Sequence, residues 1–318
     1  MSHIYIYSPS SAVRDKAAFR RGVKRLTQLG HEVEVDEAAL LSHQRFAGDD
    51  ATRLAAIGRA AASGADIAMV SRGGYGLTRL LPDLPYKHLA KAVEGGMQFV
   101  GLSDFTALQC ALQAKTGAST WAGPALGEDF GSEEPPDEIM AACFDDLACG
   151  QGEGTGWRLP MADVKALAAR QQVKSGNLPE VPAALSISGA TLWGGNLSVI
   201  CALMGTPYMP AVEGGILFLE DTNEHPYRIE RQLTQLVNAG ILGKQQAVLL
   251  GSFNRYTLVP GYDRGFNLSA VVNWVRGQIR PPVLTGLPFG HVPTKVLLPV
   301  GQQVDLMVDG RDALIFWG

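Results

Sequence analysis

Strand-forming runs alternate with helical patterns through the first third of the chain. The runs HIYIYS, HEVEVD, DIAMVS and MQFVGLS are short and mostly apolar or β-branched, as strands are. The segments RDKAAFRRGVKRLTQLG, DATRLAAIGRAAAS and DFTALQCALQAKTG repeat apolar residues at helical spacing. Because parallel strands need helical crossovers, this alternation predicts a mainly parallel sheet with helices on both faces. We therefore expect an N-terminal three-layer α/β domain.

Two unusual loops follow predicted strands of this domain. One is SRGGYG at residues 71–76, called the glycine loop below, and the other is GLSD at residues 101–104. Parallel strands bring their C-terminal ends to one edge of a sheet, where loops and helix N-termini form ligand sites. The sequence therefore predicts both loops on the same edge.

Composition narrows the class of protein. A chain of 318 residues with a net charge of −4 suggests about two domains and offers no broad basic surface for nucleic acid or an anionic membrane. The four cysteines form neither a CxxC nor a Cys/His cluster, so we expect no metal site, no cofactor and no disulfide framework. The start MSHIYIYSPSS resembles no signal peptide, and no run suits a membrane helix, so we expect a cytoplasmic protein.

The composition and the secondary-structure pattern change along the chain. Residues 1–128 carry the strand-helix alternation, whereas residues 129–182 are rich in Gly, Pro and acidic residues and read as a connecting region with a short helix. Residues 183–318 contain many strand-like runs, including TKVLLPVG, with helical stretches at 227–239 and 268–278. We expect this last part to form a second, α+β domain.

Ser103 in GLSD has two local interpretations. A serine between a strand and a helix is commonly an N-cap, which stabilises a helix by about 1 kcal/mol. It is also a candidate nucleophile, because the N–H of Asp104 in the first helical turn could stabilise an oxyanion. The local sequence alone favours the cap.

The glycine loop offers a second oxyanion donor, because glycines let a backbone approach a ligand closely. An ordinary tight turn explains it equally well, and neither the complete phosphate-loop pattern nor the dinucleotide-binding spacing is present. By itself the glycine loop is weak evidence for an oxyanion hole.

A general base for this chemistry would be a histidine. Four of the six histidines lie in or beside amphipathic or terminal segments and read as surface or structural residues: His3, His31, His43 and His88. His225 in EDTNEHPY and His291 in LTGLPFGHVPTK both occupy turns, and local sequence does not separate them.

A carboxylate would orient the base. Glu220 ends the apolar run GGILFLED, where a rigid, partly buried carboxylate can hold an imidazole. A structural role in capping a neighbouring turn is the alternative, and Asp221 and Glu224 lie in the same loop.

Five blocks decide between these interpretations by resemblance. SRGGYGLTRLLPDL, VGLSDFTALQ, GATLWGGNLSVICALMGTPYMP, GGILFLEDTNEHPYRIERQLTQL and LPFGHVPTKVLLPVG resemble, in the same order, the LD-carboxypeptidases of serine peptidase family S66. The resemblance covers nearly the whole chain. It is closest to the family members that cleave murein tetrapeptides in the cytoplasm during peptidoglycan recycling.

The resemblance implies roles and a fold. Ser103 would be the nucleophile, Glu220 the orienting acid and His291 the base, with backbone N–H groups of Gly74 and Asp104 forming the oxyanion hole. It implies a flavodoxin-like N-terminal domain with a parallel sheet, a swivelling β/β/α C-terminal domain and a homodimer. It also implies metal-free hydrolysis of a muropeptide with release of terminal D-alanine.

Less specific expectations concern the substrate. Arg72 and Arg79, in and just after the glycine loop, are candidate cations for the free carboxylate of the substrate, and Tyr75 and Asn196 are candidate cleft residues. A microcin-immunity-type peptidase of the same family is the nearer alternative, with Trp193 as a residue to stack on a nucleotide base. A non-catalytic muropeptide-binding module is the farther one. We expect the segment 150–182 to be longer than in relatives, which leaves the breadth of substrates open.

Overall fold

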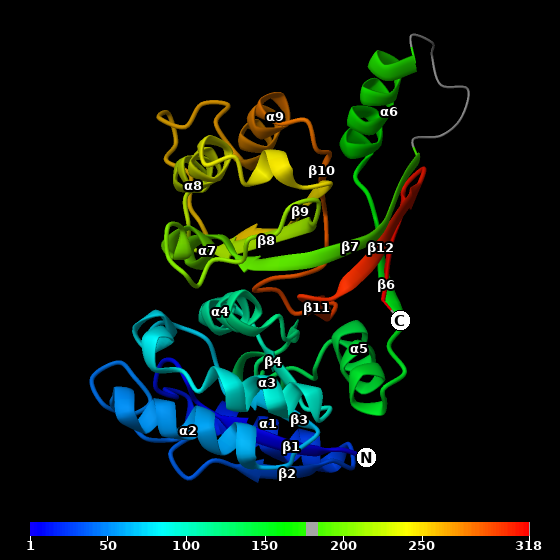
Figure 1. Cartoon of the computed structure of the whole chain (residues 1–318). Helices are drawn as coiled ribbons and strands as arrows, with labels where there is room; N and C mark the ends of the chain where they lie inside the picture. The colour runs from blue at the N-terminus through cyan, green and yellow to red at the C-terminus, as the bar shows by residue number, and fades with distance from the viewer. Residues whose placement is uncertain (176–183, 318) are drawn as a thin grey trace. The chain divides into compact units, whose positions relative to one another are not determined.

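The computed structural model describes residues 1–175 and 184–317. The chain forms two compact units. Unit 1 contains Met1–Gly152, Ala202–Ala211 and Pro293–Gly301, and unit 2 contains the segments Glu153–Cys201, Val212–Val292 and Gln302–Gly318. The chain therefore passes between the units several times (Figure 1). A division at residues 128 and 182 misses these passages, and the second limit lies outside the described residues.

Unit 1 is built on a six-stranded sheet of order β11-β5-β4-β3-β1-β2. Its strands are β1 (His3–Tyr7), β2 (Glu32–Val35), β3 (Ile67–Val70), β4 (Gln98–Gly101), β5 (Thr120–Ala122) and β11 (Leu298–Val300). The first five pair in parallel, as the alternating pattern predicts.

Strand β11 corrects one expectation. The run TKVLLPVG was assigned to the C-terminal domain, but β11 pairs antiparallel with β5 at the edge of the first sheet. Leu298 and Val300 are fully buried there. An apolar run signals a buried strand, but it does not say which sheet will accept it.

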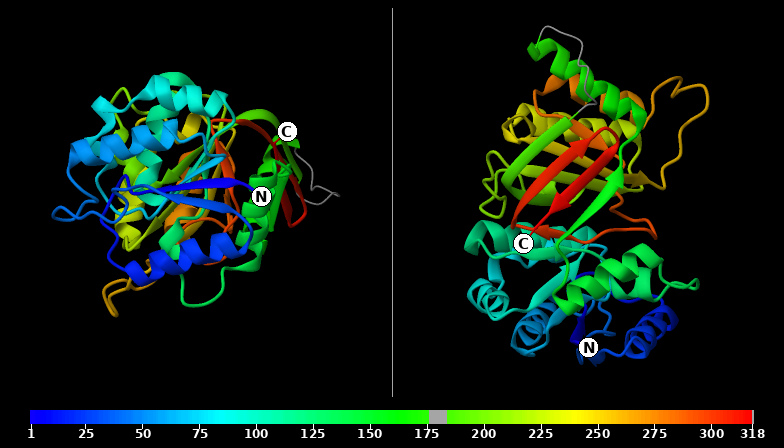
Figure 2. Two further views of the ribbon diagram at one scale, coloured as in Figure 1. Left: turned by 90° about the horizontal axis from the view of Figure 1, so that it is seen from below. Right: turned by 90° about the vertical axis from the view of Figure 1, so that its right-hand side faces the viewer.

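Helices flank this sheet: α1 (Lys16–Gln28), α2 (Asp50–Ala62), α3 (Tyr86–Glu94), α4 (Thr106–Thr116) and α5 (Glu138–Cys149). Asp15 and Asp49 cap α1 and α2 through side-chain hydrogen bonds, and Gly117 closes α4 in the left-handed conformation. Figure 2 shows α1 on one face of the strands and α2 to α4 on the other, which gives the three predicted layers. Strand β5 and helix α3 were not anticipated from the sequence.

Unit 2 is built on a seven-stranded sheet of order β10-β9-β8-β7-β12-β13-β6. Its strands are β6 (Gly154–Arg158), β7 (Ala184–Asn196), β8 (Ile216–Thr222), β9 (Ala247–Asn254), β10 (Val283–Thr285), β12 (Gln303–Asp309) and β13 (Asp312–Phe316). Strands β7 to β10 pair in parallel, and β7, β12, β13 and β6 pair antiparallel. The long β7 joins the two halves, which matches the expected mixed second domain.

The helices of unit 2 are α6 (Met161–Ser175), α7 (Leu197–Leu203, whose last two residues fall in unit 1), α8 (Pro226–Asn238) and α9 (Leu268–Gln278). Figure 1 shows α8 and α9 on one face of β8 and β9. The expected connecting region 129–182 contains α5 of unit 1 and β6 and α6 of unit 2, so its described part is integral to both units.

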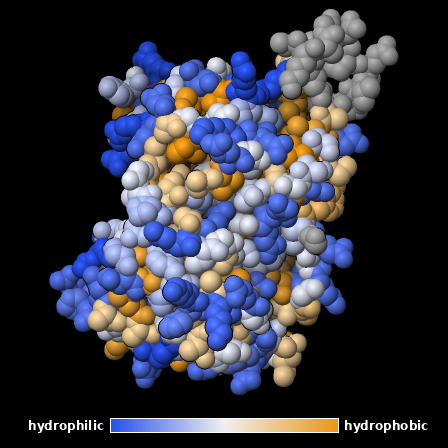
Figure 3. Space-filling model, viewed as in Figure 1, coloured by the Kyte–Doolittle hydropathy of each residue, from blue (hydrophilic) through white to orange (hydrophobic). Residues whose placement is uncertain are grey.

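The surface is mixed. On the face drawn in Figure 3, hydrophobic residues form small groups separated by polar ones. Across the described part of the chain, no helix is both long and apolar enough to cross a membrane.

Candidate active site

Ser103 lies on a strained turn between β4 and α4, with φ at +66°. Left-handed backbone costs a residue with a side chain about 1–3 kcal/mol, so neighbours must enforce it. The N-cap positions of the short 3₁₀ turn at 103–105 and of α4 are Leu102 and Phe105, and neither has a side-chain cap hydrogen bond. The capping interpretation of Ser103 is therefore wrong. A strained strand-to-helix turn is typical of serine nucleophiles in other hydrolases.

The glycine loop packs directly against this turn. A Cβ at Gly73 would lie 2.6 Å from the Cβ of Ser103 and 2.9 Å from its Oγ, so a larger residue could not approach so closely. Gly74 has φ at +112°, and a Cβ there would overlap the hydroxyl of Ser11. Close packing around two serines therefore explains the glycines at 73 and 74.

Asp104 connects the two loops. Its carboxylate is 3% exposed and accepts a hydrogen bond of 2.9 Å from the N–H of Leu77, just after the glycine loop. Burial raises the pKa of the Asp104 carboxyl, although hydrogen bonds, the one from Leu77 first among them, act in the opposite direction. The N–H of Asp104 belongs to the first helical turn, where backbone N–H groups carry the positive end of the helix dipole.

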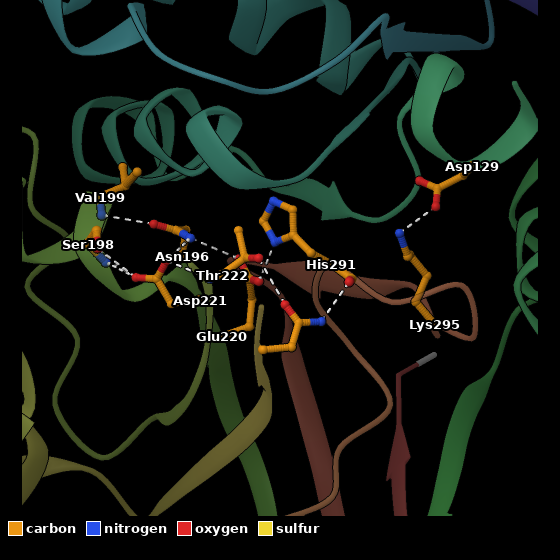
Figure 4. Close-up of polar contacts among 10 residues, drawn as sticks. Asp129, Asn196, Ser198, Val199, Glu220, Asp221, Thr222, His291 and Lys295 are labelled. Carbon is orange, nitrogen blue, oxygen red and sulfur yellow. Dashed lines mark hydrogen bonds and ion pairs between the residues drawn. The ribbon is translucent and has the colours of Figure 1, made fainter. Parts of the chain in front are cut away.

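Unit 2 carries a buried acid–imidazole pair (Figure 4). Glu220 at the end of β8 is fully buried, and its Oε2 lies 2.8 Å from Nδ1 of His291. The tautomer of His291 with the proton on Nδ1 can donate to this carboxylate, and in that tautomer Nε2 is the basic nitrogen. Asn254 fixes the backbone of this segment by donating to the carbonyl of His291 at 2.8 Å. The pair has the arrangement of the acid and base in a hydrolytic triad.

Asn196 supports the same carboxylate. Its Nδ2 donates to Glu220 Oε1 at 3.1 Å and to Asp221 Oδ1 at 3.0 Å, as Figure 4 shows. Asp221 accepts from both the N–H and the hydroxyl of Ser198 at the start of α7. The side-chain amide of Asn196 therefore binds the carboxylates of Glu220 and Asp221. Asp221, held by Ser198, has a structural role.

His225, which local sequence did not separate from His291, has other partners. It is the N-cap of α8, where its Nδ1 accepts from the N–H of Tyr227 at 3.3 Å. Its Nε2 lies 3.0 Å from Asp263. Both ring nitrogens are thus engaged in local structure, away from the carboxylate of Glu220.

The other candidate contacts around the glycine loop differ in their partners. Arg79 forms an ion pair of 2.8 Å with Asp50. Tyr75 is 45% exposed and has its ring centroid 5.9 Å from that of Phe46. Arg72 donates from Nη1 to the carbonyl of Ala12 at 3.2 Å, while its buried Nε has no hydrogen-bond partner among the described residues.

Trp193 does not suit the base-stacking role. Its side chain is 1% exposed and its Nε1 donates to Gln245 at 3.0 Å inside unit 2. It is a core residue of β7, so the feature that favoured a nucleotide-directed peptidase is absent at this position. All four cysteines are free, and the described residues contain no group of three metal-ligating side chains.

The sequence did not single out a buried ion pair in unit 1. Lys295 Nζ lies 2.5 Å from Asp129 Oδ1, and the two residues are 1% and 6% exposed (Figure 4). The adjacent Thr294 donates to Asp137 at 2.6 Å. The charged residues in GEDF and PTK were the sequence feature that could have indicated this ion pair. The two partners are 166 positions apart, so local sequence does not show that they meet.

Comparisons with known proteins give a consistent picture. A model of the LD-carboxypeptidase N-terminal domain matches residues 4–123, and a model of the LD-carboxypeptidase C-terminal domain matches residues 189–306. A protein of Streptomyces coelicolor, provisionally named a carboxypeptidase, is 34% identical over 315 residues, which is 97% of this chain and 91% of the relative.

Two further proteins represent the two chemistries considered above. The crystal structure of a muramoyltetrapeptide carboxypeptidase from Oxalobacter formigenes aligns with a TM-score of 0.82 and 37% identity, covering 98% of this chain and 97% of that one. The microcin C7 self-immunity protein of Escherichia coli is 27% identical over 258 residues, which is 78% of this chain and 72% of the relative.

Proposed function

Since the chain belongs to the LD-carboxypeptidase family, we propose that it is a serine peptidase that releases the terminal D-alanine of murein tetrapeptide. The observation that carries the serine mechanism is the left-handed Ser103, closed in by Gly73 on a strand-to-helix turn. The likeness to a muramoyltetrapeptide carboxypeptidase supports the choice of substrate.

In the proposed reaction, Ser103 Oγ attacks the carbonyl of the residue before the terminal D-alanine. Nε2 of His291, whose Nδ1 is held by Glu220, takes the hydroxyl proton. The N–H groups of Gly74 and Asp104 stabilise the oxyanion, a role in which losing one donor costs about 3 kcal/mol.

The tetrahedral intermediate then collapses. The bond to D-alanine breaks, and His291 gives its proton to the leaving amine. Water next attacks the acyl-enzyme while His291 again takes a proton, which releases the tripeptide and restores Ser103. This sequence needs no metal ion. For the carboxylate of D-alanine we propose Arg72, because its buried Nε lacks a protein partner among the described residues.

The test is release of D-alanine from purified murein tetrapeptide, followed by mass spectrometry. We expect Ser103→Ala and His291→Ala to lower the rate by roughly 10³-fold or more, with unchanged circular dichroism spectra. His225→Ala separates the two candidate histidines, and Ser63→Ala, at the end of α2, is a control for removing a serine hydroxyl. Both should keep the wild-type rate, and EDTA should have no effect.

Full activity in Ser103→Ala would exclude the serine mechanism. Loss of activity in His225→Ala but not in His291→Ala would move the base to the other turn. Wild-type protein that leaves tetrapeptide intact but cleaves an aminoacyl sulfamoyl adenosine would indicate a peptidase of the microcin-immunity type. Binding of tetrapeptide without cleavage would indicate a binding module.

We also propose that the protein is a homodimer that acts in the cytoplasm in peptidoglycan recycling. These properties rest on the family resemblance alone. Sedimentation equilibrium of the full chain tests the first of them, because a monomer mass at micromolar concentration would contradict it.

A further inference from the structure

The segment 74–77 is held from one side by the carboxylate of Asp104. This carboxylate accepts the N–H of Leu77 at 2.9 Å, and the Ser10 hydroxyl and the N–H of Gly76 also act to lower its pKa against the effect of burial. All of these partners are donors, and a carboxylate can accept from several at once. The side chain is 3% exposed, so water does not substitute for it readily.

The hydroxyl of Ser11 holds the same segment from another side. It accepts the N–H of Tyr75 at 3.0 Å, and Ser11 is 7% exposed. Gly74 directly precedes Tyr75, and a Cβ on Gly74 would lie 2.3 Å from the hydroxyl oxygen of Ser11. Gly73 in turn contacts Ser103 closely. The contacts at Gly73, Tyr75 and Leu77 therefore determine where the Gly74 N–H lies relative to Ser103.

We infer that the Asp104 carboxylate and the Ser11 hydroxyl are positioning groups that fix the glycine loop, and with it the Gly74 N–H, relative to Ser103. Asp104 thereby acts twice. Its N–H is one proposed oxyanion donor, and its side chain sets the location of the other donor. The catalytic half of this inference rests on the proposed function, whereas the structural half does not.

This arrangement has a chemical consequence. Oxyanion donors are effective only when they are fixed before the reaction, because a donor that must be reoriented loses much of its stabilisation of the transition state. A loop with several glycines has large conformational freedom of its own. Hydrogen bonds donated by this segment to Asp104 and Ser11 restrict that freedom, so their loss should affect the transition state more than substrate binding.

The first arm of the test is hydrogen–deuterium exchange of peptides that span residues 71–80. It compares wild-type protein with Asp104→Ala, Asp104→Asn and Ser11→Ala. We expect exchange in this segment to be roughly 10-fold faster or more in Asp104→Ala and in Ser11→Ala. The exchange rate of Asp104→Asn should lie between those of wild type and Asp104→Ala. An amide keeps one acceptor oxygen, but its NH2 group replaces the second oxygen and is itself a donor, so it cannot accept from the donors of the loop.

The second arm measures kcat and KM for tetrapeptide hydrolysis with the same variants. We expect kcat to fall by roughly 10- to 100-fold with KM nearly unchanged, in the order of the exchange rates. Asp36→Asn is the matched control. Asp36 is an aspartate of the same unit with the same 3% exposure, and it accepts from Tyr5 and Arg59 just after β2, the last strand of the sheet order. It should change neither the loop exchange nor kcat.

The outcomes separate the two proposals. Unchanged exchange of residues 71–80 in Asp104→Ala overturns the positioning role, whatever the activity. Faster exchange with unchanged kcat, or with a raised KM and unchanged kcat, overturns its link to the oxyanion. If the wild-type protein releases no D-alanine, the proposed function fails, and the exchange arm alone still decides whether these groups hold the loop.

Discussion

Replacing Lys295 by methionine should destabilise unit 1 severely. Lys295 enters unit 1 with the segment that continues into β11, and its ammonium lies 2.5 Å from Asp129. Methionine has a similar length but no charge, so the change leaves the carboxylate buried without its counter-ion. The N–H of Ala125, at 2.8 Å from Asp129 Oδ2, then remains as a hydrogen-bond donor to this carboxylate.

The magnitude follows from the burial of both partners. Exposures of 1% and 6% mean that water cannot replace the lost charge. Breaking one side of such a pair costs about 3–5 kcal/mol, because an uncompensated charge stays in a region of low polarity. The double variant Lys295→Met with Asp129→Asn removes both charges and keeps an acceptor for Ala125. It should therefore regain most of the stability lost in the single variant.

The loss should depend on pH in a defined direction. Burial raises the pKa of the Asp129 carboxyl, and Lys295 opposes that effect. Without Lys295 the pKa rises further. A carboxyl with a raised folded-state pKa subtracts stability at pH values above its unfolded pKa near 4, and the subtraction fades as the pH falls and the group takes up a proton. The deficit of Lys295→Met should thus shrink as the pH is lowered from neutral toward the unfolded pKa near 4.

Native-state hydrogen exchange of peptides from β5 and β11 is the suitable assay, because two units need not unfold together. The control is Lys244→Met, which removes a lysine that lies 2.6 Å from Glu213 but is exposed with its partner. That change should matter little. A Lys295→Met protein within about 1 kcal/mol of wild type, or a double variant no more stable than the single one, would refute the reasoning.

Two further predictions concern unit 1. Asp36→Asn should lower stability by about 1–3 kcal/mol at pH 7. Although burial raises the pKa of the Asp36 carboxyl, hydrogen bonds from Arg59 and Tyr5 outweigh burial and hold it below its usual value. A lowered carboxyl pKa adds stability above the unfolded pKa near 4, so the deficit should shrink progressively in denaturation curves recorded as the pH falls below that value. Burial raises the pKa of the Cys110 thiol to about 12. Maleimide should therefore label exposed Cys149 rapidly and Cys110 only on unfolding, and equal labelling rates in the native protein would contradict this.

The fold was largely predictable because its signals are local. Apolar periodicity located α1, α2, α4, α8 and α9, and the strand-helix alternation gave the parallel sheet. Sheet membership of β11 was not predictable, since any partly formed sheet edge can accept an apolar segment. The division into two units was missed because the chain returns to unit 1 twice, and no local change in composition marks either return.

The pairing of Glu220 with His291 shows why the site was harder than the fold. Both His225 and His291 lie in turns next to Pro or Gly, so local sequence could not rank them. What distinguishes His291 is a hydrogen bond to a residue 71 positions away. Gly290, with φ at +127°, lies beside Glu220, where a Cβ would be 3.0 Å from Oε2. The family resemblance supplied this long-range information, which periodicity and turn chemistry do not contain.

The turn at Ser103 explains why a motif search for a serine nucleophile is uninformative here. In the Gly-x-Ser-x-Gly pattern, glycines two residues on either side make room for the strained serine. Here Gly101 fills the first position, and a Cβ there would lie 2.7 Å from Val70 and 2.8 Å from Phe105. The second position is Phe105 itself, which is 1% exposed. The space next to the serine comes instead from Gly73 on the neighbouring loop. The steric requirement of the turn is thus met by Gly73, a residue distant in sequence, and a serine whose local sequence predicts a helix cap has a left-handed backbone instead.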